Sequence, residues 1–85
     1  MANKIDLSGR TAFVTGASRG IGESTARQLA IYGANVVLAA RSINDCARIA
    51  EEIGENALAV QCDVANYEEV KSAIEQAVKY FGGID

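Results

Sequence analysis

The stretch that decides the fold is Thr15-Gly16-Ala17-Ser18-Arg19-Gly20-Ile21-Gly22. It spaces three glycines as G-x-x-x-G-x-G, it follows the β-prone run at 11–15, and it opens a helical pattern with small residues on one face. Helix N-termini present free N–H groups and the positive end of the helix dipole, so a turn of this kind favours phosphate groups. The stretch therefore predicts a strand, a phosphate-binding turn and a helix.

Each glycine in the turn has its own steric role. By the logic of dinucleotide-binding turns, Gly16 permits the tight reversal and Gly20 lets the backbone approach a pyrophosphate. Gly22 removes a Cβ between helix and strand, and the Ser18 hydroxyl adds a hydrogen-bond donor. No Gly-Lys-Ser or Gly-Lys-Thr triplet follows, which excludes a Walker-type nucleotide loop.

Strand-like and helix-like segments alternate along the rest of the chain. Strands are predicted at 11–15, 35–40 and 57–61, and each is followed by a segment with apolar residues at helical spacing. The third helix has the cleanest apolar stripe: Val70, Ala73, Ile74, Ala77, Val78 and Phe81. The order β-α-β-α-β-α predicts an α/β Rossmann fold, the N-terminal half of a doubly wound parallel sheet with strand order 3-2-1. We expect residues 1–85 to form a partial domain that is truncated before a fourth strand, which Ile84-Asp85 approaches.

Two helix starts carry capping signals. Ser42 with Asp45 three positions later predicts an approximate capping box for the second helix, and Asn66 with Glu69 does so for the third.

Composition narrows the function classes. Eight basic and eleven acidic residues give a net charge of −3 without a basic block, which disfavours nucleic acid as a partner. No segment has the length and hydropathy of a signal peptide or of a membrane span, so we expect a cytoplasmic protein with no membrane partner. Histidine is absent, and Cys46 and Cys62 lack metal-ligand or redox spacing. We interpret both cysteines as core residues and predict no metal site.

The end of the second strand bears on the choice of dinucleotide. NAD-binding domains place an acid there for the ribose hydroxyls, whereas this sequence reads Ala40-Arg41-Ser42. Arg41 and Arg19 offer forked cationic donors for a 2′-phosphate, which favours NADP(H) over NAD by roughly two orders of magnitude. The alternative is that both arginines are solvated surface charges. Asp63, at the end of the third strand, is either an acceptor for an adenine amino group or a turn residue or helix cap.

These motifs together resemble the classical short-chain dehydrogenases/reductases, nearest to the 3-oxoacyl-[acyl-carrier-protein] reductase type. The resemblance rests on TGASRGIG at 15–22, AARS at 39–42, CDV at 62–64 and FGGID at 81–85. It implies that Gly16, Ser18, Arg19, Gly20 and Ile21 surround the cofactor phosphates, with Gly22 in the same motif. It also implies that Arg41, beside Ser42, accompanies NADP preference and that Asp63 and Val64 border the adenine.

The family pattern stops short of its catalytic residues. An Asn-Asn-Ala-Gly segment, a catalytic Ser and a Tyr-x-x-x-Lys pair normally follow FGGID, and none of them follows here. Tyr67 and Lys71 do have the Tyr-x-x-x-Lys spacing, but they open the third helix, and neighbouring glutamates oppose a lowered tyrosine pKa. We interpret them as helix-surface residues and assign no catalytic residue.

Two functions of different classes follow. The first is the NADP(H)-binding portion of an oxidoreductase that transfers hydride between nicotinamide and a carbonyl or alcohol, with 3-oxoacyl thioesters among the expected substrates. The second is a non-catalytic nucleotide-binding half-domain. A methyltransferase-type half is disfavoured because it requires an acid near Ala40. The resemblance implies a small-molecule or acyl-thioester substrate and a homotetramer for the full-length form, and the open edge of the first strand predicts association of the isolated chain.

Overall fold

A computed structural model describes residues 5–85 of the chain. It contains six alternating elements: β1 (Thr11–Thr15), α1 (Gly20–Ile31), β2 (Asn35–Ala40), α2 (Ile43–Ile53), β3 (Ala57–Gln61) and α3 (Tyr67–Phe81). The three strands are parallel in the order β1-β2-β3, with Thr11 opposite Asn35 and Val36 opposite Ala57. The predicted α/β half-sheet is therefore confirmed, including its strand order.

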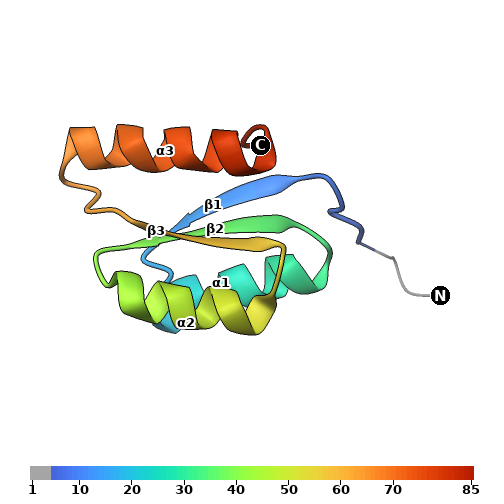
Figure 1. The fold of residues 1–85 in the computed structure, drawn as a ribbon. Coiled ribbons are helices and arrows are strands. Elements are labelled where there is room, and N and C mark those ends of the chain that lie inside the picture. Colours follow the sequence, from blue (N-terminus) through green and yellow to red (C-terminus); the bar gives the residue numbers. More distant parts are fainter. Residues whose placement is uncertain (1–4) are drawn as a thin grey trace.

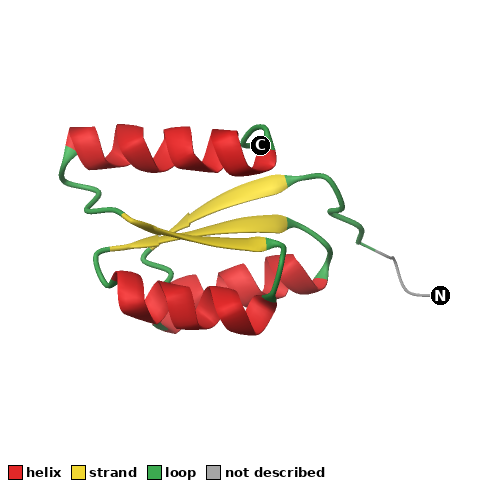
Figure 2. Cartoon of the chain, in the orientation of Figure 1, coloured by secondary structure: helices red, strands yellow, loops and turns green. Residues whose placement is uncertain are grey.

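The elements form three layers. Figure 1 shows α1 and α2 on one face of the sheet and α3 on the other. Figure 2 shows the same sandwich, with the strands between the helices. This arrangement follows from parallel pairing, since each crossover helix has to pack on a face of the sheet.

The central strand β2 explains why both faces need helices. Its side chains alternate, so Val36 and Leu38 join the core beneath α1 and α2, whereas Val37 and Ala39 join the core beneath α3. All four side chains are at most 1% exposed. The strand predicted at 35–40 is confirmed, and its apolar residues are buried on both faces of the sheet.

Cys46 and Cys62 are both buried, one in each core, and both are free thiols. Their interpretation as core residues is confirmed. Within residues 5–85, no helix combines the length and hydropathy that a membrane span requires.

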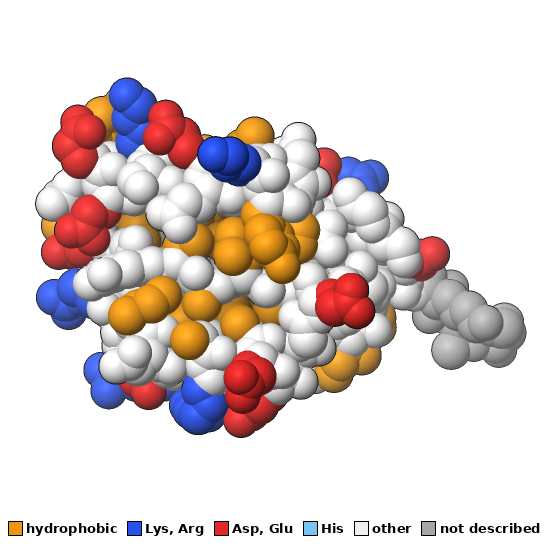
Figure 3. Space-filling view, viewed as in Figure 1, with side chains coloured by type: hydrophobic (Ala, Val, Ile, Leu, Met, Phe, Trp, Pro, Cys, Tyr) orange, Lys and Arg blue, Asp and Glu red, His pale blue; other side chains and the backbone are white. Residues whose placement is uncertain are grey.

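Helix α3 covers its face of the sheet only in part. Ala73 and Ala77 are fully buried against the strands, but Ile74 and Val78 are 41% and 44% exposed. The predicted apolar stripe is thus wider than the surface that the three strands offer it. In the face of the molecule drawn in Figure 3, further hydrophobic side chains lie in the band between α3 and the layer of α1 and α2.

Candidate cofactor site

The carboxyl ends of the three strands meet at one edge of the sheet, because parallel strands all run in the same direction. A cavity of about 630 Å³ lies at this edge, within the range usual for small-molecule sites. Its lining comes from the turn after β1, the end of β2 with the start of α2, and the end of β3: Gly16, Ser18, Arg19, Ala40, Arg41, Ser42, Asp45, Cys62, Asp63 and Val64.

Seven of the ten predicted site residues line this cavity: Gly16, Ser18, Arg19, Arg41, Ser42, Asp63 and Val64. The other three, Gly20, Ile21 and Gly22, do not line it and lie at the start of α1. The Ile21 side chain is 86% exposed. Gly20 and Gly22 have no side chain, so any contact that they make to a ligand comes from the backbone.

The turn after β1 depends on its glycines. Gly16 and Gly20 have φ angles of 62° and 63°, a left-handed conformation that other residues rarely adopt. A Cβ on Gly22 would lie 2.2 Å from the carbonyl oxygen of Gly16 and 3.1 Å from that of Thr15. This geometry agrees with the steric roles predicted for Gly16 and Gly22, and the closest atom to a Cβ on Gly22 belongs to the turn itself. The approach of a pyrophosphate to Gly20 stays a prediction.

The start of α1 has free hydrogen-bond donors. Arg19 is the N-cap, yet its side chain makes no capping hydrogen bond, and the Glu23 N–H is the one that donates to the Arg19 carbonyl, at 3.3 Å. The amides of residues 20–22 precede this bond and have no helical carbonyl to bind. They form a cradle of the kind that accepts phosphate oxygens.

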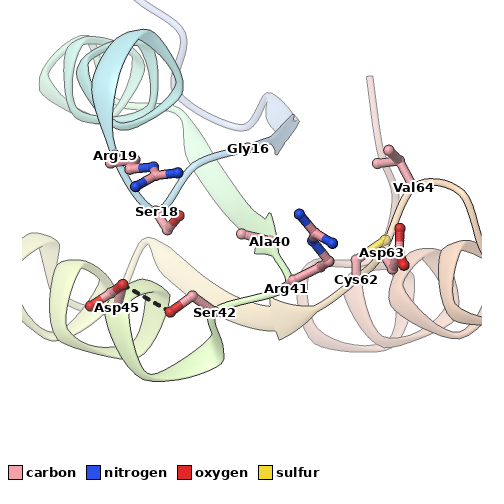
Figure 4. A pocket seen from close by; sticks show the side chains of 10 residues that line it. All are labelled: Gly16, Ser18, Arg19, Ala40, Arg41, Ser42, Asp45, Cys62, Asp63 and Val64. Carbon is pink, nitrogen blue, oxygen red and sulfur yellow. Dashed lines mark hydrogen bonds between the residues drawn. The ribbon is translucent and has the colours of Figure 1, made fainter.

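Arg41 directly follows β2, and its guanidinium points into the space between the Gly16 turn and Asp63 (Figure 4). Neither Arg41 nor Arg19 forms a salt bridge with any of the described residues. Ala40, where an NAD-binding domain would carry an acid, is a small side chain only 7% exposed. The two cations are thus available to an anionic ligand.

Asp63 is held in the turn between β3 and α3. Its N–H donates to Glu69 Oε1 at 3.0 Å, and its Oδ1 accepts from the Ala65 N–H at 3.0 Å. Asn66 Oδ1 accepts from the Glu69 N–H at 3.1 Å, which confirms half of the predicted capping box. The other half differs, because the Glu69 carboxylate reaches back to Asp63 and fixes the backbone at the cavity.

The Ser42–Asp45 pair departs from the predicted capping box. Ser42 is the N-cap of α2 but accepts no capping hydrogen bond. Its hydroxyl donates to Asp45 Oδ2 at 2.8 Å instead, and both residues line the cavity. Sequence reasoning assigned Asp45 to a cap alone and did not place it in the site.

Cys62 is the second lining residue that sequence reasoning did not place in the site. It is 2% exposed, and burial, followed by the charges of Glu69 and Asp63, raises the pKa of its thiol. A neutral, buried thiol here contributes packing beneath the cavity.

Tyr67 and Lys71 lie on the exposed surface of α3, and neither lines the cavity. No cluster of three or more metal-ligating His, Cys, Asp or Glu residues occurs within residues 5–85.

Comparison with known proteins agrees with the fold. Residues 10–85 match the short chain dehydrogenase family. The chain belongs to this family. A (+)-cis,cis-nepetalactol synthase, NEPS3 of Nepeta racemosa, is 48% identical over 84 residues, covering 96% of this chain and 31% of that protein. Hydroxysteroid dehydrogenase-like protein 2 of Homo sapiens is 42% identical over 89 residues, covering 93% of this chain and 21% of that protein.

Solved structures show the same fold. A 3-ketoacyl-(acyl-carrier-protein) reductase from Brucella melitensis, complexed with NADH, superposes with a TM-score of 0.91 at 41% identity, covering 94% of this chain and 33% of that chain. A short-chain dehydrogenase/reductase from Caenorhabditis elegans, solved with cofactor, gives 0.85 at 32% identity, covering 93% and 31%. The chain spans about a third of these structures and a third or less of the relatives above.

Proposed function

We propose that this chain binds the adenosine end of NADP(H), as the cofactor-binding portion of a short-chain dehydrogenase/reductase. One observation carries the proposal: a single cavity at the carboxyl edge of the sheet unites the Gly16 turn, Arg41 and Asp63. The bound cofactor supplies hydride transfer between its nicotinamide and a carbonyl or alcohol carbon. The residues of this chain hold and orient its far end.

The cavity, together with the start of α1, offers a group for each part of the adenosine end. The free amides at the start of α1, with the Ser18 hydroxyl, bind the pyrophosphate. Arg41 and Arg19, whose side chains have no ion-pair partner among residues 5–85, bind the 2′-phosphate. Asp63 and Val64 border the adenine. Because no acid stands at Ala40 to receive ribose hydroxyls, we propose NADP(H) rather than NAD(H), although the Brucella relative holds NADH.

The activity of the whole protein is part of the same proposal. We propose a carbonyl or alcohol substrate, with 3-oxoacyl thioesters as the leading class, in a homotetrameric cytoplasmic enzyme. The 85-residue chain by itself is proposed to be catalytically incomplete. NADPH oxidation by the chain with an acetoacetyl thioester would contradict that statement.

The second candidate is a nucleotide-binding half-domain without enzymatic activity. It is favoured by the placement of Tyr67, which is 74% exposed and lies outside the cavity lining. The two candidates share the binding site and differ in chemistry. Turnover by a polypeptide that continues beyond Asp85 would select the enzyme, and binding without turnover would select the half-domain.

Calorimetry with 2′,5′-ADP tests the proposed site. We expect Arg41→Glu to weaken binding at least tenfold, because one charge-assisted hydrogen bond is worth about 1.5 to 3 kcal/mol. Arg48→Glu is the matched control, since Arg48 is an exposed arginine of α2 outside the cavity lining and changes the net charge equally. Equal weakening by both variants, or no binding to the folded wild type, would refute the proposal.

A further inference from the structure

The cavity carries an acid that the motif does not require. Asp45 lies in the first turn of α2 and lines the cavity beside Ser42. Figure 4 shows the two side chains joined, with the Ser42 hydroxyl donating to Asp45 Oδ2 at 2.8 Å. Because the Ser42 hydroxyl proton is engaged in this hydrogen bond, the Ser42 oxygen can accept a hydrogen bond from a ligand in the cavity but cannot donate one.

Asp45 also changes the charge of the site. The lining contains two arginines, Arg19 and Arg41, and two aspartates, Asp45 and Asp63, so its formal charge is balanced. Asp63 is tied by backbone hydrogen bonds on the β3 side. Asp45 accepts a hydrogen bond from Ser42 and forms no salt bridge within residues 5–85, so no cation neutralises it locally.

We propose that Asp45 is a specificity-determining residue that lowers the preference of this site for a 2′-phosphorylated adenosine. The inference rests on the proposed function and deepens it. A phosphate monoester carries about −1.5 to −2 charge at neutral pH, so a carboxylate in the same cavity repels it, whereas an uncharged 2′-hydroxyl is little affected. The arginines attract the 2′-phosphate, and Asp45 sets how far they favour it.

A purely structural role for Asp45 makes a different prediction. An acid in the first turn of a helix stabilises that helix through the dipole. Removing it would then lower the free energy of unfolding and affect all ligands alike. The two roles are separated by ligands that differ in the 2′-phosphate alone.

The experiment compares 2′,5′-ADP with 5′-AMP by calorimetry on the 85-residue chain. The readout is the ratio of their dissociation constants, which isolates the 2′-phosphate. The ratio is taken as the dissociation constant of 5′-AMP divided by that of 2′,5′-ADP, so a higher ratio means a stronger preference for the 2′-phosphate. We expect Asp45→Asn to raise this ratio roughly three- to tenfold at low salt, and we expect the increase to be smaller at high salt. Asp45→Ser, which keeps a short polar side chain without the charge, has to shift the ratio in the same direction. Glu51→Gln removes the same charge from α2 outside the cavity lining and has to leave the ratio unchanged.

The outcomes separate this inference from the proposal beneath it. A ratio that is unchanged or lowered in both Asp45 variants, while both ligands still bind, overturns the role of Asp45 and leaves the cofactor site intact. An equal rise in Glu51→Gln also overturns it, because the effect would then reflect net charge. Failure of folded wild-type protein to bind either ligand refutes the cofactor site itself, and the inference with it.

Discussion

Thr11 and Asp85, 74 positions apart in the sequence, are joined by two hydrogen bonds at the open edge of the sheet. The Thr11 N–H donates to Asp85 Oδ2 at 2.8 Å, and the Asp85 N–H donates to the Thr11 carbonyl at 2.9 Å. Thr11 is 3% exposed, so its N–H has little access to water when the carboxylate is lost.

Asp85→Ala therefore tests this link. We expect it to lower the free energy of unfolding by about 1 to 3 kcal/mol, the cost of leaving a buried donor unpaired. Urea denaturation measures the change. Asp6→Ala is the control, because Asp6 accepts its hydrogen bond from the Ser8 N–H in an exposed local turn. An equal decrease in the free energy of unfolding in the two variants would show that the hydrogen bonds to Thr11 stabilise the fold no more than the exposed turn at Asp6 does.

Gly22→Ala tests the close packing of the phosphate-binding turn. The added Cβ would stand 2.2 Å from a backbone oxygen of Gly16 and 2.7 Å from its carbonyl carbon, so the turn has to shift. We expect a loss of roughly 2 kcal/mol or more in thermal or urea unfolding, together with weaker binding of 2′,5′-ADP. Gly83→Ala is the matched control, since a Cβ there meets no atom within 4 Å and should change stability by less than about 0.5 kcal/mol. A stable, fully binding Gly22→Ala protein would contradict the assigned geometry.

The salt-bridge pair between α1 and α2 predicts a pH dependence of stability. The Arg27 guanidinium, 2.6 Å from Glu52, holds the pKa of that carboxyl below its usual value of 4.5. A depressed pKa stabilises the fold at higher pH, and this stabilisation is lost as the pH falls from about 4.5 through the folded-state pKa. Hydrogen bonds from Ser8 lower the pKa of Asp6 and act in the same direction.

Glu52→Gln should therefore flatten the fall in thermal midpoint between about pH 5 and pH 3. Glu51→Gln, at a position without an ion pair among the described residues, should leave the slope as in the wild type. Identical slopes in all three proteins would remove Glu52 from the explanation.

Exposed apolar residues on α3 predict self-association of the 85-residue chain. Ser72 and Gln76 share a hollow with β3, so Ile74 and Val78, on the opposite flank of α3, lie toward β1. Within residues 5–85 no strand pairs with the far edge of β1. Edges and apolar flanks of this kind promote intermolecular contact.

We expect concentration-dependent association in sedimentation velocity, reduced by Ile74→Lys combined with Val78→Lys. The double variant Ile31→Lys and Tyr32→Lys adds the same charge on the exposed end of α1, in the other helical layer, and should leave association largely unchanged. A wild-type chain that remains monomeric across the concentration range would contradict this prediction.

The sequence predicted the fold well because its signals are local. Strand bounds at 11–15, 35–40 and 57–61 coincide with β1, β2 and β3, since glycine turns and buried apolar runs mark them. The turn glycines were likewise predictable, because their φ angles and close approaches are properties of the backbone. The exposure of Ile74 and Val78 was not, since a helical stripe does not reveal how much of it a partner covers.

The site was predictable to the level of segments. The three strand ends had to meet, and they bring the Gly16 turn, Arg41 and Asp63 to one cavity. Asp45 was missed because the capping-box spacing places it in the first turn of α2 but does not report that this turn borders the cavity. Cys62 was missed as a lining residue because a core position at the end of a strand can also form the base of a cavity.

The central claim is that three separate segments form one binding site for the adenosine end of NADP(H). Amide chemical shifts recorded during titration with 2′,5′-ADP test it most directly. We predict shifts at residues 16–22, 41–42 and 63–64 that follow one common saturation curve, with no change at the hollow between α1 and α2 around Ile31 and Asn56. Shifts restricted to one segment, different saturation curves for the three segments, or shifts centred on Ile31 and Asn56 would contradict the claim.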